Sequence, residues 1–172
     1  MNQGYVHMYT GDGKGKTTAS VGQCVRALGA GFSVYFSQFC KKGDFSEFLF
    51  LSKASEKIRI EQFGSKEFLN QKNFKKQKDL GLKGFEKASK EIFSLDYDLV
   101  VLDEIVFAVY SGIIEEDKVL NLIKSKPYQT ELIITGRGEC HQLAEASDIV
   151  TVMENRRHYF EKNVQARKGI EF

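Results

Sequence analysis

The feature that most constrains the fold is the stretch "YTGDGKGKTTAS", residues 9–20. The segment before it, "GYVHMYT" at residues 4–10, alternates apolar and polar residues and is typical of a strand. After it, "TTASVGQCVRALGAG" has apolar residues at helical spacing, which predicts a helix that begins near Thr17. A glycine-rich connection from a strand to a helix exposes backbone N–H groups and the positive end of the helix dipole. Such a loop is suited to bind a polyphosphate.

The loop departs at one position from the usual phosphate-binding pattern G-x-x-x-x-G-K-[ST], because Thr10 stands where the first glycine is expected. The alternative is a turn that only caps a helix, but the order strand, loop, helix favours phosphate binding. We expect Lys16 to supply a mobile positive charge and Thr17 to offer its hydroxyl to Mg²⁺. The carboxylate of Asp12 would oppose an anion, so it should point outward or meet Lys14. The predicted cradle comprises Gly11, Asp12, Gly13, Lys14, Gly15, Lys16, Thr17 and Thr18.

A second polar group stands at the end of "YDLVVLDE", residues 97–104. Its continuous apolar run is typical of a strand that is buried on both faces of a parallel sheet. Asp103 and Glu104 at its end occupy the place from which phosphate-binding proteins hold magnesium. An ordinary polar strand end is the alternative. The sequence therefore predicts a metal site formed by Thr17, Asp103 and Glu104.

Strands and helices alternate along the chain, which predicts a single α/β domain over residues 1–172, with a mainly parallel sheet and helices on both faces. We expect the fold of proteins that carry such a phosphate-binding loop (P-loop), without internal repeats or linkers. Residues 65–83, polar and rich in lysine, are predicted to be a long mobile loop or a solvated helix start, followed by an amphipathic helix over 80–93. Further strands are predicted at 32–39, 57–63, 130–135 and 148–155, and further helices at 47–54, 115–126 and 140–147.

Composition excludes several classes of protein. The net charge is only +2, so no strong overall field attracts the chain to nucleic acid or membrane. The three cysteines are widely spaced, which favours reduced thiols in the cytoplasm over a disulfide framework. The chain shows no secretory leader and no apolar run long enough to span a membrane. We therefore expect a cytoplasmic protein.

Two familiar reactions fit the sequence poorly. A kinase usually needs arginines that neutralise the transferred phosphate, yet Arg59 is the only arginine between Gly31 and Asp103. A GTPase needs a guanine-binding "NKxD" loop after a late strand, where this chain has "ITGRG". The phosphate-binding loop therefore points to a nucleotide enzyme with a different chemistry.

Several segments, in order along nearly the whole chain, resemble the P-loop family of ATP:corrinoid adenosyltransferases. They are "TGDGKGKTTAS", "SQFCKKGDFSE", "YDLVVLDEI", "ELIITGRG" and "ASDIVTVMENRRHYFEKNVQARKGIEF". The resemblance implies that a Co(I) corrinoid attacks C5′ of ATP and that triphosphate leaves, in adenosylcobalamin synthesis or salvage. It also implies Mg²⁺, a homodimer, and a reductant such as flavodoxin that supplies Co(I).

The resemblance also assigns residues. It implies that the loop and Lys16 bind the triphosphate, that Thr17 and Glu104 hold magnesium beside Asp103, and that Gln38 and Arg137 contact the nucleotide. The better-studied members of the family carry an N-terminal extension over the corrinoid, and a phenylalanine and a tryptophan that exclude water from the cobalt, whereas shorter members also exist. This chain lacks tryptophan, so Phe68 is the candidate for the apolar contact, with Phe63 as the weaker one.

Other interpretations stay open. The lysine-rich region between residues 72 and 90, with interleaved phenylalanines, would suit a nucleic-acid surface, although a solvated helix face is commoner. An ATP-dependent switch that binds protein or nucleic acid, or a small-molecule kinase, are the alternative functions. His158 matches a histidine of the family's C-terminal part, and a structural role is its alternative.

Overall fold

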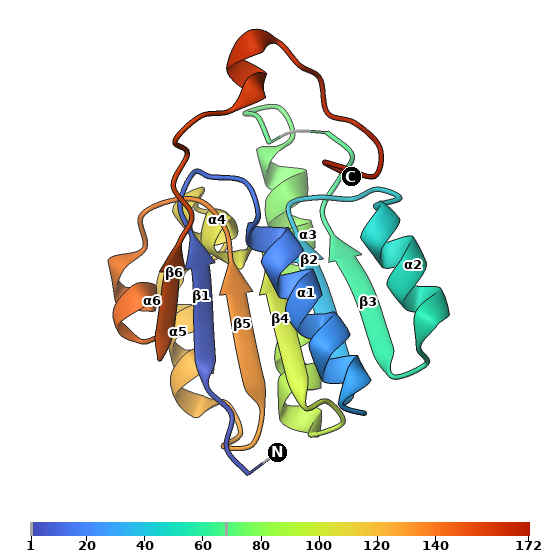
Figure 1. Cartoon of the computed structure of the whole chain (residues 1–172). Coiled ribbons are helices and arrows are strands. Elements are labelled where there is room, and N and C mark those ends of the chain that lie inside the picture. Colours follow the sequence, from blue (N-terminus) through green and yellow to red (C-terminus); the bar gives the residue numbers. More distant parts are fainter. Residues whose placement is uncertain (1, 68) are drawn as a thin grey trace.

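The computed structural model describes residues 2–67 and 69–172 as a six-stranded, all-parallel sheet between two layers of helices (Figure 1). The strand order is β3-β2-β4-β5-β1-β6. This arrangement confirms the predicted α/β class. The strands are β1 (Val6–Thr10), β2 (Val34–Phe39), β3 (Ile58–Phe63), β4 (Leu99–Asp103), β5 (Glu131–Thr135) and β6 (Ile149–Val152).

The helices cover the two faces of the sheet. Helices α1 (Lys16–Gly29) and α2 (Ser46–Ala54) pack on one face, in front of the sheet in Figure 1. The other face is covered by α3 (Phe74–Ser94), α4 (Ile105–Tyr110), α5 (Glu116–Ser125) and α6 (His141–Glu145). Each layer has its own apolar core, and the central strands β2 and β4 are buried along their whole length. The continuous apolar run over 97–104 predicted this burial for β4, whereas that of β2 was not predicted.

The third helix begins earlier than the sequence indicated. It starts at Phe74 instead of residue 80, so of the two alternatives predicted for residues 65–83 the structure has the helix start from Phe74 on. Of the large apolar residues that suggested the helix, only Ile92 is buried, and Phe93 is half exposed. The helix instead faces the core with small residues, because a Cβ atom at Gly84 would lie 2.3 Å from the ring of Phe63. Close approach of the helix backbone to the sheet is thus combined with apolar contacts of Phe85, Ala88 and Ile92.

Two further elements escaped prediction. Helix α4 follows β4 directly, after Glu104 takes the left-handed conformation with φ 63°. Its sequence "IVFAVY" continues the apolar run of β4, so hydrophobic periodicity does not mark the boundary. The short 3₁₀ helix η1 (Tyr159–Lys162) lies in the C-terminal segment, residues 153–172. This segment leaves β6 and arches over the carboxyl end of the sheet (Figure 1).

Two other expectations concern cysteine and membrane. All three cysteines are free, as predicted, and Cys24 lies in the core beneath α1. Among the described residues, no helix combines the length and apolar character that crossing a bilayer requires.

Candidate functional site

The glycine-rich loop connects β1 to α1 at the carboxyl edge of the sheet. Gly15 precedes the helix with φ 123°, a conformation that favours glycine, and no side chain caps the helix. The N–H groups of the first helical turn are therefore available to a ligand. The predicted helix start near Thr17 is confirmed to within one residue. This geometry is that of an anion-binding helix end.

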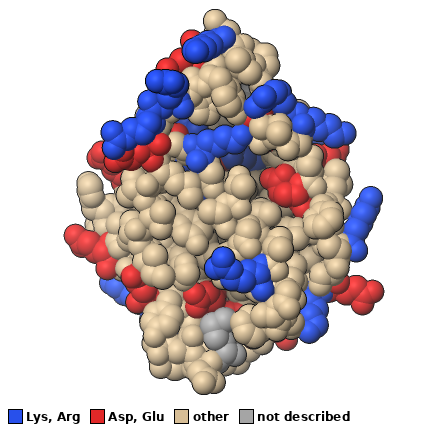
Figure 2. Space-filling view, in the orientation of Figure 1, with Lys and Arg blue, Asp and Glu red and all other residues tan. Residues whose placement is uncertain are grey.

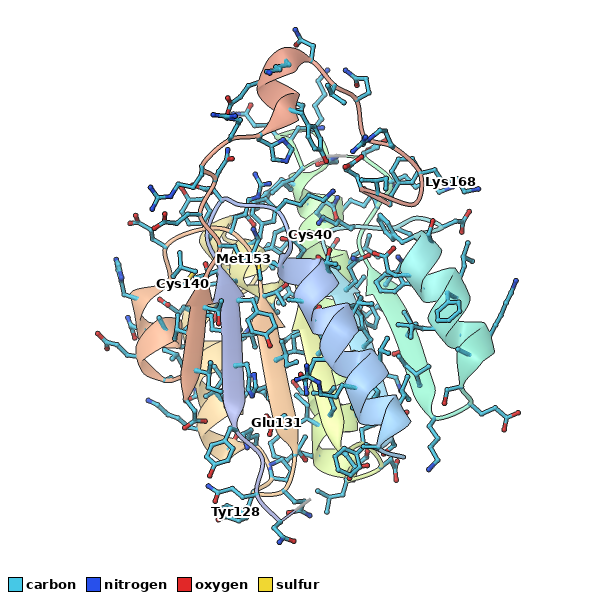
Figure 3. All side chains as sticks on the ribbon, in the orientation of Figure 1. Cys40, Tyr128, Glu131, Cys140, Met153 and Lys168 are labelled. Carbon is cyan, nitrogen blue, oxygen red and sulfur yellow. The ribbon has the colours of Figure 1, made fainter. Side chains whose placement is uncertain are left out.

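The other two glycines of the loop have a different role from the one expected. The sequence suggested that they turn N–H groups toward one centre, but the N–H of Gly13 donates to the carbonyl of Met153 at 2.7 Å. Cβ atoms at Gly11 and Gly13 would lie 2.5 and 2.7 Å from backbone oxygen of residue 153 or 154. These glycines thus allow the start of the C-terminal segment to pack directly on the loop. Figure 3 shows Met153 at this edge of the sheet.

Lys16 lies inside the loop and is only 7% exposed. Its ammonium donates to the carbonyls of Gly11 at 2.6 Å and Gly13 at 2.8 Å. Since an ammonium has three donors, one remains for a ligand. Burial lowers the pKa of Lys16, and the nearby charge of Arg137 lowers it further, whereas Glu104 opposes the shift. The side chain is therefore held in place before any phosphate arrives.

The carboxylate of Asp103 is fully buried and accepts hydrogen bonds from several side chains. The hydroxyl of Thr135 donates at 2.7 Å, and that of Thr17 donates to both carboxylate oxygens, at 3.0 and 3.2 Å. Burial raises the pKa of Asp103, and Glu104 raises it further, while Lys41 and the hydrogen bonds oppose this. The aspartate fixes the Thr17 hydroxyl that was predicted to face magnesium.

A row of amides extends this network across three strands. Gln62, Gln38 and Asp103 are direct neighbours on β3, β2 and β4. Gln38 donates to Asp103 at 3.0 Å, Gln62 donates to Gln38 at 3.0 Å, and the N–H of Gly43 donates to Gln62 at 3.2 Å. Gln38, predicted to contact nucleotide, thus lies beneath Asp103 with both ends of its amide bonded. Sequence analysis missed Gln62, although "QF" ends both strands.

Glu104 follows Asp103 and forms an ion pair with Lys41, which sequence analysis also missed. Its side chain is 11% exposed. The hydroxyl of Thr17 and the carboxylate of Glu104 are oxygen donors of the kind that Mg²⁺ prefers, so these residues fit the predicted metal. Among the described residues, no group of three or more acidic, histidine or cysteine side chains could hold a metal unaided. Phosphate oxygens and water would therefore complete the coordination.

Arg137 lies in the loop after β5. Its side chain is exposed and makes no hydrogen bond or ion pair with any residue that the structure describes, so it does not cap a helix. Its charge nevertheless acts on both Lys16 and Lys41, which places it at the same edge of the sheet. A cation without a protein partner beside an anion-binding loop is suited to contact phosphate.

The remaining candidates differ in their outcome. Asp12 is exposed and does not pair with Lys14, whose ammonium contacts the C-terminal segment. Thr18 is exposed on the first turn of α1.

Phe63 packs against Phe39, with ring centroids 5.9 Å apart, and belongs to the core. Phe68 lies outside the described residues. The ring of His158 accepts from the N–H of Phe160, 3.1 Å away, within its own turn.

The surface around the loop is basic and hollowed. Figure 2 shows Lys and Arg side chains gathered at the end of the molecule where the C-terminal segment arches over the loop. An open depression of about 420 Å³ is lined by Gly11, Asp12 and residues 152–156. A second one, of about 340 Å³, lies between residues 42–45 and α2. Both give a ligand access to the edge of the sheet.

Comparison with known proteins identifies the family. The family of ATP:corrinoid adenosyltransferases BtuR/CobO/CobP matches residues 2–172. The chain belongs to this family of enzymes. It is 32% identical to a corrinoid adenosyltransferase of Pseudomonas aeruginosa, over 99% of this chain and 84% of that protein. A corrinoid adenosyltransferase of Escherichia coli K12 is 29% identical over 99% of this chain and 86% of its own length.

A structural relative confirms the architecture alone. The flagellar accessory protein FlaH of Methanocaldococcus jannaschii matches with a TM-score of 0.61, over 88% of this chain and 72% of that one. The two sequences are only 11% identical. The shared sheet and helices therefore extend far beyond the adenosyltransferase family, and the family membership depends on the sequence motifs.

Proposed function

We propose that the protein transfers the 5′-deoxyadenosyl group of ATP to the Co(I) centre of a corrinoid and releases triphosphate. In this step a cobalt–carbon bond forms at C5′, the C5′–oxygen bond breaks, and its electron pair leaves with triphosphate. The observation that carries the proposal is the preformed anion site of Lys16, Arg137 and the α1 end, within a chain of this family.

The residues suit this chemistry because Co(I) is itself a strong nucleophile and needs no general base. The protein must hold ATP in position and stabilise the charge of the leaving triphosphate. The first turn of α1 supplies N–H donors and Lys16 keeps a donor for the ligand. Arg137 adds a cation that has no ion-pair partner among the described residues. These groups are fixed before the reaction, so little reorganisation is required when charge develops.

Magnesium would be held by Thr17 and Glu104 together with phosphate oxygens, and when bound it would neutralise charge on the triphosphate. Asp103 orients the hydroxyl of Thr17 through the bonds described above. The Gln38–Gln62 row in turn orients Asp103. In this proposal Asp103 and Gln38 act behind the nucleotide instead of touching it.

Further parts of the proposal depend on the family resemblance. They are a homodimer, a separate reductant such as flavodoxin, a cytoplasmic location, and an apolar contact of Phe68 with the corrinoid. For Phe68→Ala we expect a slower reaction with corrinoid and unchanged ATP affinity. A large loss of ATP affinity in this variant would contradict the contact.

The test is an anaerobic reaction with Mg·ATP and chemically reduced Co(I) cobalamin, repeated with cobinamide. We expect the absorbance of a light-sensitive cobalt–carbon species to appear together with one triphosphate per turnover. ADP as product would indicate a kinase instead. No conversion of either corrinoid, with ATP binding retained, would overturn the proposal and favour a nucleotide-dependent switch.

A further inference from the structure

The C-terminal segment is attached to the phosphate-binding loop through Lys14. The Lys14 ammonium donates to Glu171 Oε1 at 2.8 Å, to the carbonyl of Ile170 at 2.9 Å and to the Tyr159 hydroxyl at 3.2 Å. An ammonium has three donors. All three are directed to the C-terminal segment, so none is left for a phosphate while this arrangement holds.

The partners of Lys14 also bind one another. Tyr159 donates a hydrogen bond to Glu171, and the backbone N–H of Arg167 donates to Glu171 Oε2 at 2.7 Å. The guanidinium of Arg167 bonds the same carboxylate and lies 5.0 Å from the centre of the Tyr159 ring. We call Lys14, Tyr159, Arg167 and Glu171 the latch. These hydrogen bonds, first that from Arg167, hold the pKa of Glu171 below its ordinary value.

The segment is also fixed at two other places. At its start, Met153 accepts the hydrogen bond from Gly13 on the same loop. At its far end, the hydroxyl of Ser46, in the first turn of α2, donates to the Phe172 carbonyl at 3.1 Å. The segment therefore crosses the loop from the β6 side to the α2 side, with the latch between these two attachments (Figure 1).

We propose that Glu171 and Lys14 are a positioning pair that closes the C-terminal segment over bound ATP, and that Lys14 is not itself a phosphate ligand. A closed segment excludes water from the loop and so strengthens the interaction of the remaining cations with phosphate. The effect on ATP rests on the proposed function, whereas the closure of the segment does not.

The first test follows closure by limited trypsin digestion without nucleotide. Cleavage after Arg167 requires that its side chain leaves Glu171. In Lys14→Met and in Glu171→Gln we expect this cleavage to be about tenfold faster than in the wild-type protein. In the double variant it should be no faster than in whichever single variant is cleaved faster. Glu161→Gln is the matched control, because Glu161 lies on the same segment and has no side-chain partner among the described residues. Unchanged cleavage in both single variants would overturn the proposal.

The second test measures ATP binding at equilibrium, without corrinoid. We expect each single variant to weaken ATP affinity about threefold to tenfold, and the double variant to match the weaker-binding single one. If Lys14 instead binds phosphate directly, Glu171→Gln should strengthen ATP binding while Lys14→Met weakens it, and this pair of results would overturn the proposal. If the variants weaken ATP binding as expected but the wild-type protein converts no corrinoid, the latch proposal stands and only the proposed reaction is wrong.

Discussion

Lys14 and Lys16 stand two residues apart in one loop but have opposite surroundings. Lys16 is 7% exposed and bonds loop carbonyls, and burial lowers its pKa. The side chain of Lys14 is 39% exposed, and hydrogen bonds from its ammonium to Glu171 and Tyr159 raise its pKa. Lys16 is held within the loop by its own carbonyls, whereas Lys14 binds the C-terminal segment. Residue type alone therefore does not predict which of the two ammonium groups keeps a donor for a ligand.

The largest expected difference between the two lysines is in activity. Lys16→Ala removes the preformed cation, and we expect the adenosylation rate to fall on the order of 10²- to 10³-fold, as for loss of a donor that stabilises developing charge. Lys14→Ala should lower it by less than about tenfold, since Lys14 acts through the C-terminal segment. Single-turnover rates with Mg·ATP and Co(I) cobalamin, with circular dichroism as the check on folding, measure both. Equal losses would remove the distinction between the two lysines.

A second prediction concerns the amide row behind Lys16 and Thr17. Gln38→Leu removes one of the hydrogen bonds to the buried Asp103, which keeps those from Thr17 and Thr135. It also takes away the acceptor of the Gln62 amide nitrogen, so we expect a loss of about 1–3 kcal/mol of unfolding free energy. Activity should fall about 10- to 100-fold, as when groups that orient a ligand are removed. Urea denaturation and the same rate assay measure these effects.

Ser37→Ala is the control for that variant. Ser37 is also buried on β2, where its hydroxyl bonds the carbonyl of Val101 at 3.0 Å, outside the amide row. We expect it to lose stability with little change in rate. If both variants lose activity equally, the effect belongs to β2 as a whole and not to the row.

The next prediction concerns how the contact between Lys14 and Glu171 depends on pH. A lowered carboxylate pKa gives stability that is present above the ordinary value of about 4.3 and is lost as the pH falls through the folded value. The raised pKa of Lys14 gives stability that is lost only above its ordinary value of about 10.4. The groups that face Glu171 are Lys14, Tyr159 and Arg167.

Between roughly pH 6 and 9, Lys14 and Glu171 therefore both keep their charges. Cleavage after Arg167, corrected with an unstructured reference peptide, should be constant across this range. A rate that changes severalfold within it would show that another titrating group controls the segment.

The smallest effect is expected at the thiols. Burial raises the pKa of Cys24 to about 12 and that of Cys40 to about 12, with a further contribution from Asp103 and Glu104, respectively. Since only the thiolate reacts, both should resist alkylation at pH 8 in the folded protein. A cysteine placed by Lys168→Cys, on a side chain that extends from the C-terminal segment (Figure 3), should react at the rate of a free thiol. Fast reaction of Cys24 would show that the core between α1 and the sheet opens.

The sequence predicted the elements whose residues carry an unambiguous local signal. The loop, the helix after it and the buried strand that ends at Asp103 follow from glycine, hydrophobic runs and charge. Helix α3 was predicted to begin too late because its first residues, "FKKQKD", are mostly polar and give no apolar periodicity. Helix α4 was missed because its apolar residues continue those of β4.

The partners within the site could not be predicted, because they depend on which strands become neighbours. Gln62 meets Gln38 only when β3 lies beside β2, and Thr135 meets Asp103 only across β4 and β5. The latch is a clearer case. Nothing in the local sequence around Lys14 indicates that Glu171, 157 residues away, takes one of its donors. For Asp12 the sequence left two alternatives, an outward orientation or a contact with Lys14, and the structure has Asp12 exposed while Lys14 pairs with Glu171.

The separation between Lys14 and Glu171 also matters during synthesis. At about 5–20 residues per second, the ribosome needs about 8 to 30 s to reach residue 171 after residue 14. During that interval Lys14 has no carboxylate from the C-terminal segment to meet, and β1 acquires its neighbours β5 and β6 only near the end of it. The C-terminal segment therefore reaches the loop only after both neighbours of β1, the strands β5 and β6, have been made.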